Sequence, residues 1–316
     1  MKNGNKVVLI GDGFVGSSYA FSLINSGLAT ELAIIDIRKD KELADVNDLL
    51  DATVLTSSAT IVKIGDYEDC KDCDLVVLAY GNSQKNLKDR LDDIKIASEM
   101  VLATIPKVVD AGYKGVILLA TNPVDVIARV VREVSDFPYE KIVGTGTSLD
   151  TARFAQYLAI ETGFNVRDIN AYVIGEHGNS SVAVWSNANI NGIGIDKFIK
   201  NIDNSYKDKV GEMIRDKAFR IIEGKGATHF GIANCLLTFT RAILLDEKKV
   251  LMASAYLRGE YKNEGLYTGV PTVIGKNGSE KILEMPIDDR EQKMFDRSCK
   301  ALKENFLLAD LGYNNK

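Results

Sequence analysis

The stretch VIGEHGNSSV (173–182) contains His177, one of only two histidines in this chain of 316 residues. Free histidine titrates near pH 6.5, so an imidazole held in a cleft can give and take a proton at neutral pH. A histidine that follows a strand can also be a buried residue with a packing role. The local sequence leaves both interpretations open, and residues elsewhere in the chain have to decide between them.

Polar side chains also stand where an α/β protein would place a ligand. Asn122 directly follows a strand-like apolar run, and ligands of such folds bind at the carboxyl ends of the strands. Asp150 and Arg153 are three residues apart, which places both on one face if their segment is helical. A proton-transfer group, a carboxylate and a guanidinium could therefore share one site.

A polar segment, GNSQKNLKDRLD (81–92), follows another strand-like run. It contains Gln84 and Arg90, and a helical pattern begins at its end. We interpret it as a loop that leads into a helix at the ligand-binding edge of the sheet.

Three glycines near the N-terminus have the spacing of a dinucleotide-binding turn. Gly11, Gly13 and Gly16 form G-x-G-x-x-G between a strand-like and a helix-like run. The spacing allows a tight turn, close approach of a pyrophosphate and packing of helix on strand. Asp36 ends the second strand-like run, where a carboxylate accepts from ribose hydroxyls and repels a 2′-phosphate. The pattern favours NAD over NADP and over a glycine turn that binds no nucleotide.

The elements that must position these residues alternate between strand and helix over the first 145 residues. Strands are expected at 6–10, 31–36, 60–64, 74–80, 115–120 and 141–144, and helices at 14–26, 39–52, 91–111 and 123–134. The expected buried positions are Leu43, Val46 and Leu50 in one helix, and Leu91, Ile94, Ala97, Val101, Ile105 and Val108 in another. This alternation predicts an α/β, Rossmann-type, doubly wound parallel sheet in an NAD-binding domain, residues 1–145.

The second half has a different pattern, which predicts a mixed α+β substrate or catalytic domain, residues 146–316. A helix is expected from Ser148, with Ser148 as its cap. Further helices are expected at 204–223, 227–246 and 288–309, and strands at 250–257, 269–275 and 280–285.

The composition narrows the classes of partner. The chain is 46% hydrophobic and 26% charged, with a net charge of −5. Nucleic acids and anionic membranes reward clustered Lys and Arg, so neither is expected as a partner. The apolar stretches end well before the roughly 18 residues of a membrane span, and the N-terminal run is too short for a secretory signal. We therefore expect a cytoplasmic protein.

The pair Cys70 and Cys73 has the spacing of half a zinc or redox site. A zinc site needs a second pair of ligands, and His177 and His229 lie in unrelated contexts. We expect two reduced cysteines on a short helical turn, and no metal site.

Seven segments in order along the chain resemble the L-lactate/malate dehydrogenase family, and its bacterial lactate branch most closely. They are GDGFVG, IIDI, SQKNLKDRLD, TNPVD, GTGTSLDTARF, GEHGN and GKGATHFGIA. The resemblance covers essentially the whole chain. It implies an NAD-dependent oxidoreductase that acts on a small 2-oxo or 2-hydroxy acid.

The resemblance also implies the roles of individual residues. His177 would be the acid/base, Asp150 would orient its ring, and Arg153 would bind the substrate carboxylate. Arg90 would polarise the substrate carbonyl as its loop closes. The remaining implied contacts are Gln84, Asn122 and Thr228 for the substrate, and Gly11, Gly13, Phe14, Val15, Gly16, Asp36, Gly81 and Asn122 for NAD. His229 has no matching role, so a packing or surface position is favoured.

Gln84 occupies the position at which this family sets specificity. A malate enzyme is expected to have Arg there, because a second substrate carboxylate needs a second cation. Neutral Gln84 favours pyruvate over oxaloacetate. Asn179 stands where lactate enzymes usually have Asp, and L-2-hydroxyisocaproate dehydrogenases also carry GEHGN. A broader L-2-hydroxy acid dehydrogenase therefore stays open, as does a non-catalytic NAD-binding protein.

Two further expectations rest on the resemblance. Bacterial lactate dehydrogenases that fructose bisphosphate activates bind it through an Arg and a His, which are Ala155 and Asn170 here. We therefore expect no such activation. The family forms dimers and tetramers, and tetramers are usual in the lactate branch, so a homotetramer is expected.

Overall fold

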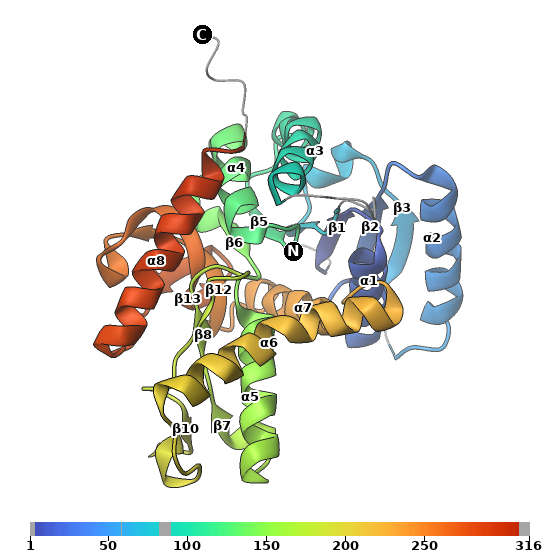
Figure 1. Cartoon of the computed structure of the whole chain (residues 1–316). Helices are drawn as coiled ribbons and strands as arrows, with labels where there is room; N and C mark the ends of the chain where they lie inside the picture. The colour runs from blue at the N-terminus through green and yellow to red at the C-terminus, as the bar shows by residue number, and fades with distance from the viewer. Residues whose placement is uncertain (1–3, 58, 82–89, 310–316) are drawn as a thin grey trace.

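The computed structural model describes residues 4–57, 59–81 and 90–309, with Arg90–Asp92 described in the backbone only. Its centre is a nine-stranded sheet in the order β14-β13-β12-β6-β5-β4-β1-β2-β3. Figure 1 shows helices on both sides of this sheet, while α5 (Ser148–Thr162) and the short strands β7 (Ile169–Asn170) and β10 (Asn189–Ile190) extend away from it.

Six strands of the sheet are parallel, in the order β3-β2-β1-β4-β5-β6. They are β1 (Lys6–Ile10), β2 (Glu31–Ile35), β3 (Ile61–Ile64), β4 (Leu75–Leu78), β5 (Val116–Leu119) and β6 (Ile142–Gly144). The chain crosses from β3 to the far side of β1 to form β4, and ligands of doubly wound sheets bind beside such a reversal. The prediction of a Rossmann-type sheet is confirmed.

The second half of the chain extends the same sheet. Strands β12 (Lys249–Arg258), β13 (Glu264–Gly275) and β14 (Gly278–Ile282) pair antiparallel to one another, and β12 pairs with β6. The sheet therefore runs across residue 145 without a break. The division into domains 1–145 and 146–316 stays a prediction.

Side chains that alternate along the strands build a core on each face of the sheet. On one face, Val8 and Ile10 of β1 pack in the cluster that contains α3 (Arg90–Asp110), α4 (Val124–Ser135) and α8 (Asp289–Phe306). On the other, Val7 and Leu9 pack with α1 (Phe14–Ser26), α2 (Lys39–Thr53) and α7 (Phe230–Leu244). This alternation holds the two helical layers and the turns between them in place.

A third core lies away from the sheet, between α5, α6 (Asn204–Lys225) and short strands that include β8 (Val173–Ile174). Phe154 packs edge-on against Trp185, with ring centroids 5.0 Å apart. This core fixes α5 against the segment that carries His177.

Two local predictions are wrong. Ser148 does not cap α5, because the N-cap position is Thr147 and no side chain caps the helix. The Ser148 hydroxyl instead donates to the Met252 carbonyl and ties α5 to β12. In α2, Val46 is buried as expected, but Leu43 and Leu50 are exposed, because the helix turns Val46 and Leu49 toward the sheet.

In the α3 pattern, Ile94, Ala97, Val101, Ile105 and Val108 are buried as expected, and the Leu91 side chain lies outside the described part. Cys70 and Cys73 are buried, unbridged cysteines at a short 3-10 helix, Tyr67–Cys70. Within the described ranges, no group of three His, Cys, Asp or Glu side chains could hold a metal ion.

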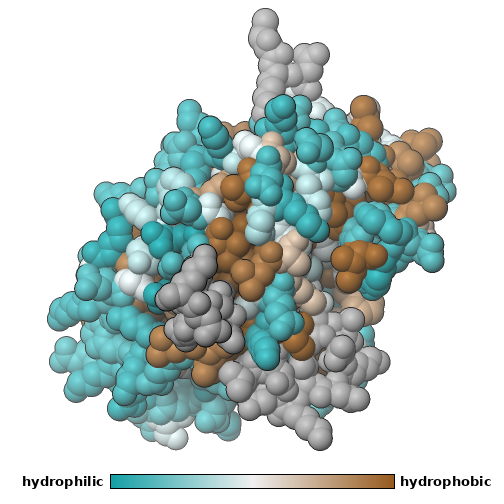
Figure 2. Space-filling model, turned by 90° about the horizontal axis from the view of Figure 1, so that it is seen from above, coloured by the Kyte–Doolittle hydropathy of each residue, from teal (hydrophilic) through white to brown (hydrophobic). Residues whose placement is uncertain are grey.

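The surface seen from above is mostly hydrophilic, with separate hydrophobic patches (Figure 2). Exposed apolar side chains of α2 and the residues that follow it include Leu43, Leu50, Val54 and Leu55. No helix in the described part of the chain is long and apolar enough to cross a membrane.

Candidate active site

The glycine turn between β1 and α1 has the geometry that a dinucleotide requires. Gly11 has φ +101°, and a Cβ there would stand 2.4 Å from the Tyr80 backbone nitrogen. A Cβ on Gly16 would stand 2.0 Å from the Gly11 carbonyl oxygen. At Gly13, by contrast, nothing lies within 4 Å of that position. The turn is therefore tightly packed at Gly11 and Gly16 and open at Gly13. Helix α1 begins at Phe14, directly after the open position. A pyrophosphate needs this arrangement, because it binds to the backbone of the turn and to the N-terminus of the helix.

Asp36 lies at the end of β2, beside this turn. Its Oδ2 accepts from the Asp12 backbone nitrogen at 2.6 Å, and its Oδ1 accepts from the Arg38 backbone nitrogen at 2.9 Å and from Arg38 Nε at 3.1 Å. Burial raises the pKa of Asp36, but these hydrogen bonds and the Arg38 charge lower it below its usual value overall. The Asp36 carboxylate therefore stays ionised. A ribose bound at this position would share the carboxylate with the Arg38 guanidinium. The turn and this carboxylate fit NAD.

His177 and Asp150 form a close pair at the other end of the site. His177 Nδ1 lies 2.6 Å from Asp150 Oδ2. A carboxylate only accepts, so Nδ1 donates and Nε2 stays available on the other side of the ring. Burial lowers the pKa of His177, but the charge and hydrogen bond of Asp150 raise it more, so the net shift is upward. The ring is therefore held ready to carry a proton near neutral pH.

Arg153 completes this group from one turn further along α5. Its Nη1 donates to Asp150 Oδ1 at 3.0 Å, so Asp150 lies between a histidine and a guanidinium. Burial raises the pKa of Asp150, but His177 and then Arg153 lower it below the usual range overall. Arg153 is only 7% exposed, and its other nitrogens can still bind a planar carboxylate with two hydrogen bonds.

The backbone of His177 is held by a second carboxylate that the sequence did not indicate. Asp125, in the first turn of α4, accepts from the His177 backbone nitrogen at 2.8 Å and from the Ser254 hydroxyl at 2.6 Å. Burial raises the pKa of Asp125 to about 6, although Ser254 and His177 oppose this. His177 is therefore fixed through its ring by α5 and through its backbone by α4.

The loop that carries His177 begins at Gly175, whose backbone pairs with Gly269 of β13 through two hydrogen bonds of 2.9 Å. Gly175 has φ +90°, and a Cβ there would stand 2.7 Å from the Ser298 hydroxyl oxygen. The same hydroxyl accepts from the Glu176 backbone nitrogen at 2.8 Å. Only glycine fits at 175, and α8 and β13 together set the position of His177.

The other predicted residues follow the ends of strands or begin helices. Asn122 is exposed, two residues before α4, and Gly81 is exposed after β4. Phe14 is exposed and Val15 half-buried at the start of α1. Thr228 is half-buried between α6 and α7. Gln84 lies outside the described residues, and Arg90 is described only as the first residue of α3.

His229 contacts α1 close to the glycine turn. Its Nδ1 lies 2.8 Å from the Ser18 hydroxyl of α1, and its ring stacks on Phe14 with centroids 5.7 Å apart. Burial, and then the charge of Lys225, lower its pKa. These contacts and its half-buried position fit the expected packing or surface position of His229.

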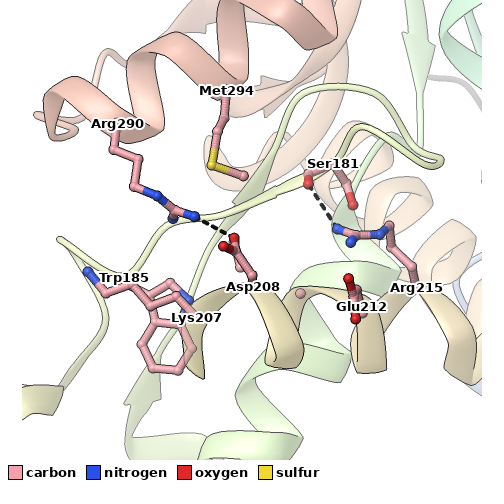
Figure 3. Close-up of a pocket in the computed structure, with 10 residues that line it drawn as sticks. Ser181, Trp185, Lys207, Asp208, Glu212, Arg215, Arg290 and Met294 are labelled. Carbon is pink, nitrogen blue, oxygen red and sulfur yellow. Dashed lines mark hydrogen bonds and ion pairs between the residues drawn. The ribbon is translucent and has the colours of Figure 1, made fainter. Parts of the chain in front are cut away.

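A cavity of about 130 Å³ lies between α6, α8 and residues 181–185. Figure 3 shows the Arg290 side chain reaching Asp208, and Arg215 reaching the Ser181 carbonyl oxygen at 3.5 Å. None of the predicted site residues lines it. Arg215 therefore ties α6 to the end of the segment that carries His177.

Sequence reasoning missed the supporting residues Asp125, Ser254 and Ser298. Asp125 stands inside the segment TNPVD, three residues after Asn122, and an acidic residue in the first turn of a helix was a signal within reach. Ser254 and Ser298 gave none, because their partners are 129 and 122 residues away in the chain.

Family models agree with this geometry. A model described as the lactate/malate dehydrogenase NAD binding domain matches residues 5–144, and one described as the lactate/malate dehydrogenase alpha/beta C-terminal domain matches residues 147–309. The chain belongs to the lactate/malate dehydrogenase family, and the resemblance seen in the sequence is confirmed.

The relatives are similar over nearly the whole chain. An L-lactate dehydrogenase of Staphylococcus epidermidis is 43% identical to this chain, and the alignment covers 96% of this chain and 97% of that protein. An L-lactate dehydrogenase 2 of Staphylococcus aureus is 44% identical and covers 96% of both chains. The crystal structure of a minor L-lactate dehydrogenase from Enterococcus mundtii in a ligand-bound form has a TM-score of 0.94 at 35% identity, covering 98% of this chain and 100% of that one.

Proposed function

We propose that the protein is an NAD-dependent L-lactate dehydrogenase that interconverts pyruvate and L-lactate. The observation that carries the proposal is the Asp150–His177 pair at 2.6 Å, with Arg153 on the same carboxylate and a dinucleotide turn in the same chain. The similarity to L-lactate dehydrogenases over almost the full length supports it.

The turn at Gly11, Gly13 and Gly16 and the Asp36 carboxylate would hold NADH, which would supply the hydride that C2 of pyruvate accepts. In the same direction His177 Nε2 donates a proton to the C2 oxygen, which becomes the hydroxyl of L-lactate. Asp150 stabilises the imidazolium before this transfer and keeps the ring in the tautomer that faces the substrate. The reverse reaction returns the proton to His177. A non-catalytic NAD-binding protein would not need the buried network of His177, Asp150 and Arg153.

Arg153 binds the substrate carboxylate, because a guanidinium matches a carboxylate with two parallel hydrogen bonds. Arg90 polarises the C2 carbonyl of the bound substrate. Asn122 bonds near the carbonyl and the nicotinamide ribose, and Thr228 lines the pocket for the substrate side chain.

Gln84 sets the preference among 2-oxo acids. We expect pyruvate to give a higher kcat/KM than oxaloacetate by about 10²-fold or more, because the second carboxylate of oxaloacetate would be desolvated without a cation. NADH oxidation by purified protein with pyruvate, oxaloacetate and 2-oxoisocaproate measures this. A preference for oxaloacetate would contradict it, and a preference for 2-oxoisocaproate would favour the broader L-2-hydroxy acid dehydrogenase. No turnover with any of the three would favour the NAD-binding protein.

Fructose 1,6-bisphosphate is expected to leave the KM for pyruvate unchanged. Ala155 and Asn170 offer no cation to a phosphate. Initial rates at low pyruvate, with and without millimolar bisphosphate, measure the effect. A severalfold drop in KM on addition of the bisphosphate would show that other cations form an effector site.

The enzyme is proposed to act in the cytoplasm, in glycolysis and fermentation, where reduction of pyruvate regenerates NAD. It is also proposed to form a homo-oligomer, most simply a tetramer. The exposed apolar residues Leu43, Leu50, Val54 and Leu55 support this, because a face of that kind is usually covered by another chain.

A further inference from the structure

The nucleotide-binding turn contains a buried carboxylate. Asp12 stands between Gly11 and Gly13, and its residue surface is 0% exposed. Within the described part of the chain, its Oδ1 accepts no hydrogen bond, and its Oδ2 lies 3.3 Å from the Lys41 ammonium. A buried carboxylate needs a counter-ion because desolvation disfavours its charge. Lys41 of α2 is that counter-ion.

The ammonium of Lys41 is shared between two acids. It also pairs with Asp45, one helical turn further along α2, so the three groups carry a net charge of −1 when both carboxylates are ionised. On the other side, Arg38 donates to the Asp12 backbone carbonyl at 3.2 Å and pairs with Asp36. Asp36 and Arg38 pair with one another. In the described part of the chain, Lys41 is the cation that pairs directly with the side chain of Asp12.

The same turn has to accept a pyrophosphate, which is itself negatively charged. An uncompensated Asp12 would repel it, and repulsion between like charges is strong where protein excludes water. We propose that Lys41 determines the affinity of the enzyme for NAD by neutralising Asp12, so that the turn can accept the pyrophosphate. This inference rests on the proposed function only in that the turn binds NAD.

The effect depends on pH with a sign that the geometry fixes. Burial raises the pKa of Asp12 to about 7, while Lys41 lowers it and Asp45 raises it. Removing Lys41 therefore raises this pKa further. At pH 6 Asp12 is then protonated and neutral. The loss of Lys41 leaves only Asp45 without its partner, and the effect on NADH binding is small because the Asp45 side chain is 29% exposed to water. At pH 9 Asp12 of the variant is ionised to a larger extent. NADH then binds either against the repulsion of this carboxylate or with the uptake of a proton by Asp12, and in both cases its affinity falls.

NADH affinity, measured by fluorescence titration without substrate, tests this. Lys41→Met is expected to weaken binding about tenfold at pH 9 and less than twofold at pH 6. Lys41→Arg keeps the cation and should bind as the wild type does at both pH values. The matched control is Lys63→Met, because Lys63 is also paired with two acids, Glu31 and Asp69, on the far strand β3.

The double variant Asp12→Asn/Lys41→Met removes both charges and should recover wild-type affinity at pH 9. Comparison with Asp12→Asn alone does not depend on the stability of Lys41→Met. Once Asp12 is neutral, removing Lys41 leaves only Asp45 without its partner, and because the Asp45 side chain is 29% exposed to water the change in NADH affinity should be less than about twofold. Equal affinity of Lys41→Met and the wild type at pH 9, or a double variant that binds as weakly as Lys41→Met, would overturn the inference. A wild-type protein that does not bind NADH would instead overturn the proposed function.

Discussion

Replacing His177 with Asn is expected to lower kcat/KM for pyruvate by about 10²–10⁴-fold, the range that a positioned acid/base contributes. Asparagine cannot deliver a proton to the C2 oxygen. The dinucleotide turn is on other elements, so NADH affinity should change less than about twofold. Steady-state NADH oxidation and fluorescence titration of the same preparation measure the two quantities.

The pH profile separates this role from a merely structural one. Because the net shift of the His177 pKa is upward, the imidazolium persists to a higher pH than in a free histidine. Pyruvate reduction should therefore be constant below that pKa and fall as the pH rises through it. The variant should lose this limb. His229→Asn, the other histidine, should keep it, and a His177→Asn enzyme with the wild-type profile would rule out His177 as the proton donor.

The Rossmann-type half of the sheet was predictable because each of its elements has a local sequence pattern. Each strand is a short apolar run followed by a turn and a helix, so periodicity alone indicated the Rossmann-type half. The pattern could not indicate that β12, β13 and β14 join the same sheet, because pairing between β6 and β12 depends on contacts over more than 100 residues, such as Gly144 with Ser254. Local patterns also failed at Leu43 and Leu50. Leucines at helical spacing show an apolar face but not whether this chain or another covers it.

The candidate site divides in the same way. The candidates His177, Asp150 and Arg153 were recognisable because they stand in short segments, GEHGN and GTGTSLDTARF, that resemble the family. The supporting groups Asp125 and Lys41 were not recognisable, because Asp125 reaches the His177 backbone, and Lys41 reaches Asp12 in the nucleotide-binding turn, only after folding. Asp12 is visible in the sequence as an acidic residue inside a glycine turn. Whether it is exposed or buried against a lysine depends on the tertiary structure.

Replacing Arg153 with Leu is expected to lower kcat/KM for pyruvate by about 10²–10⁴-fold, because the substrate carboxylate would enter a desolvated site without its cation. Most of the loss should appear as a higher KM, and a misplaced C2 should also lower kcat. A second effect follows from the structure. The Arg153 charge lowers the pKa of His177, so its removal should move the alkaline limb of the pH profile to higher pH.

Arg153→Lys separates these two effects. Lysine keeps a positive charge near Asp150, so the alkaline limb should stay close to its wild-type position, but it cannot make the two parallel hydrogen bonds of a guanidinium. KM for pyruvate should therefore still rise by about tenfold or more. In both variants Asp150 loses the hydrogen bond from Arg153 Nη1. The thermal unfolding temperature of each variant shows whether the protein stays folded without it. A folded Arg153→Leu enzyme with an unchanged KM would mean that another cation binds the carboxylate, and Arg90 would be the next residue to replace.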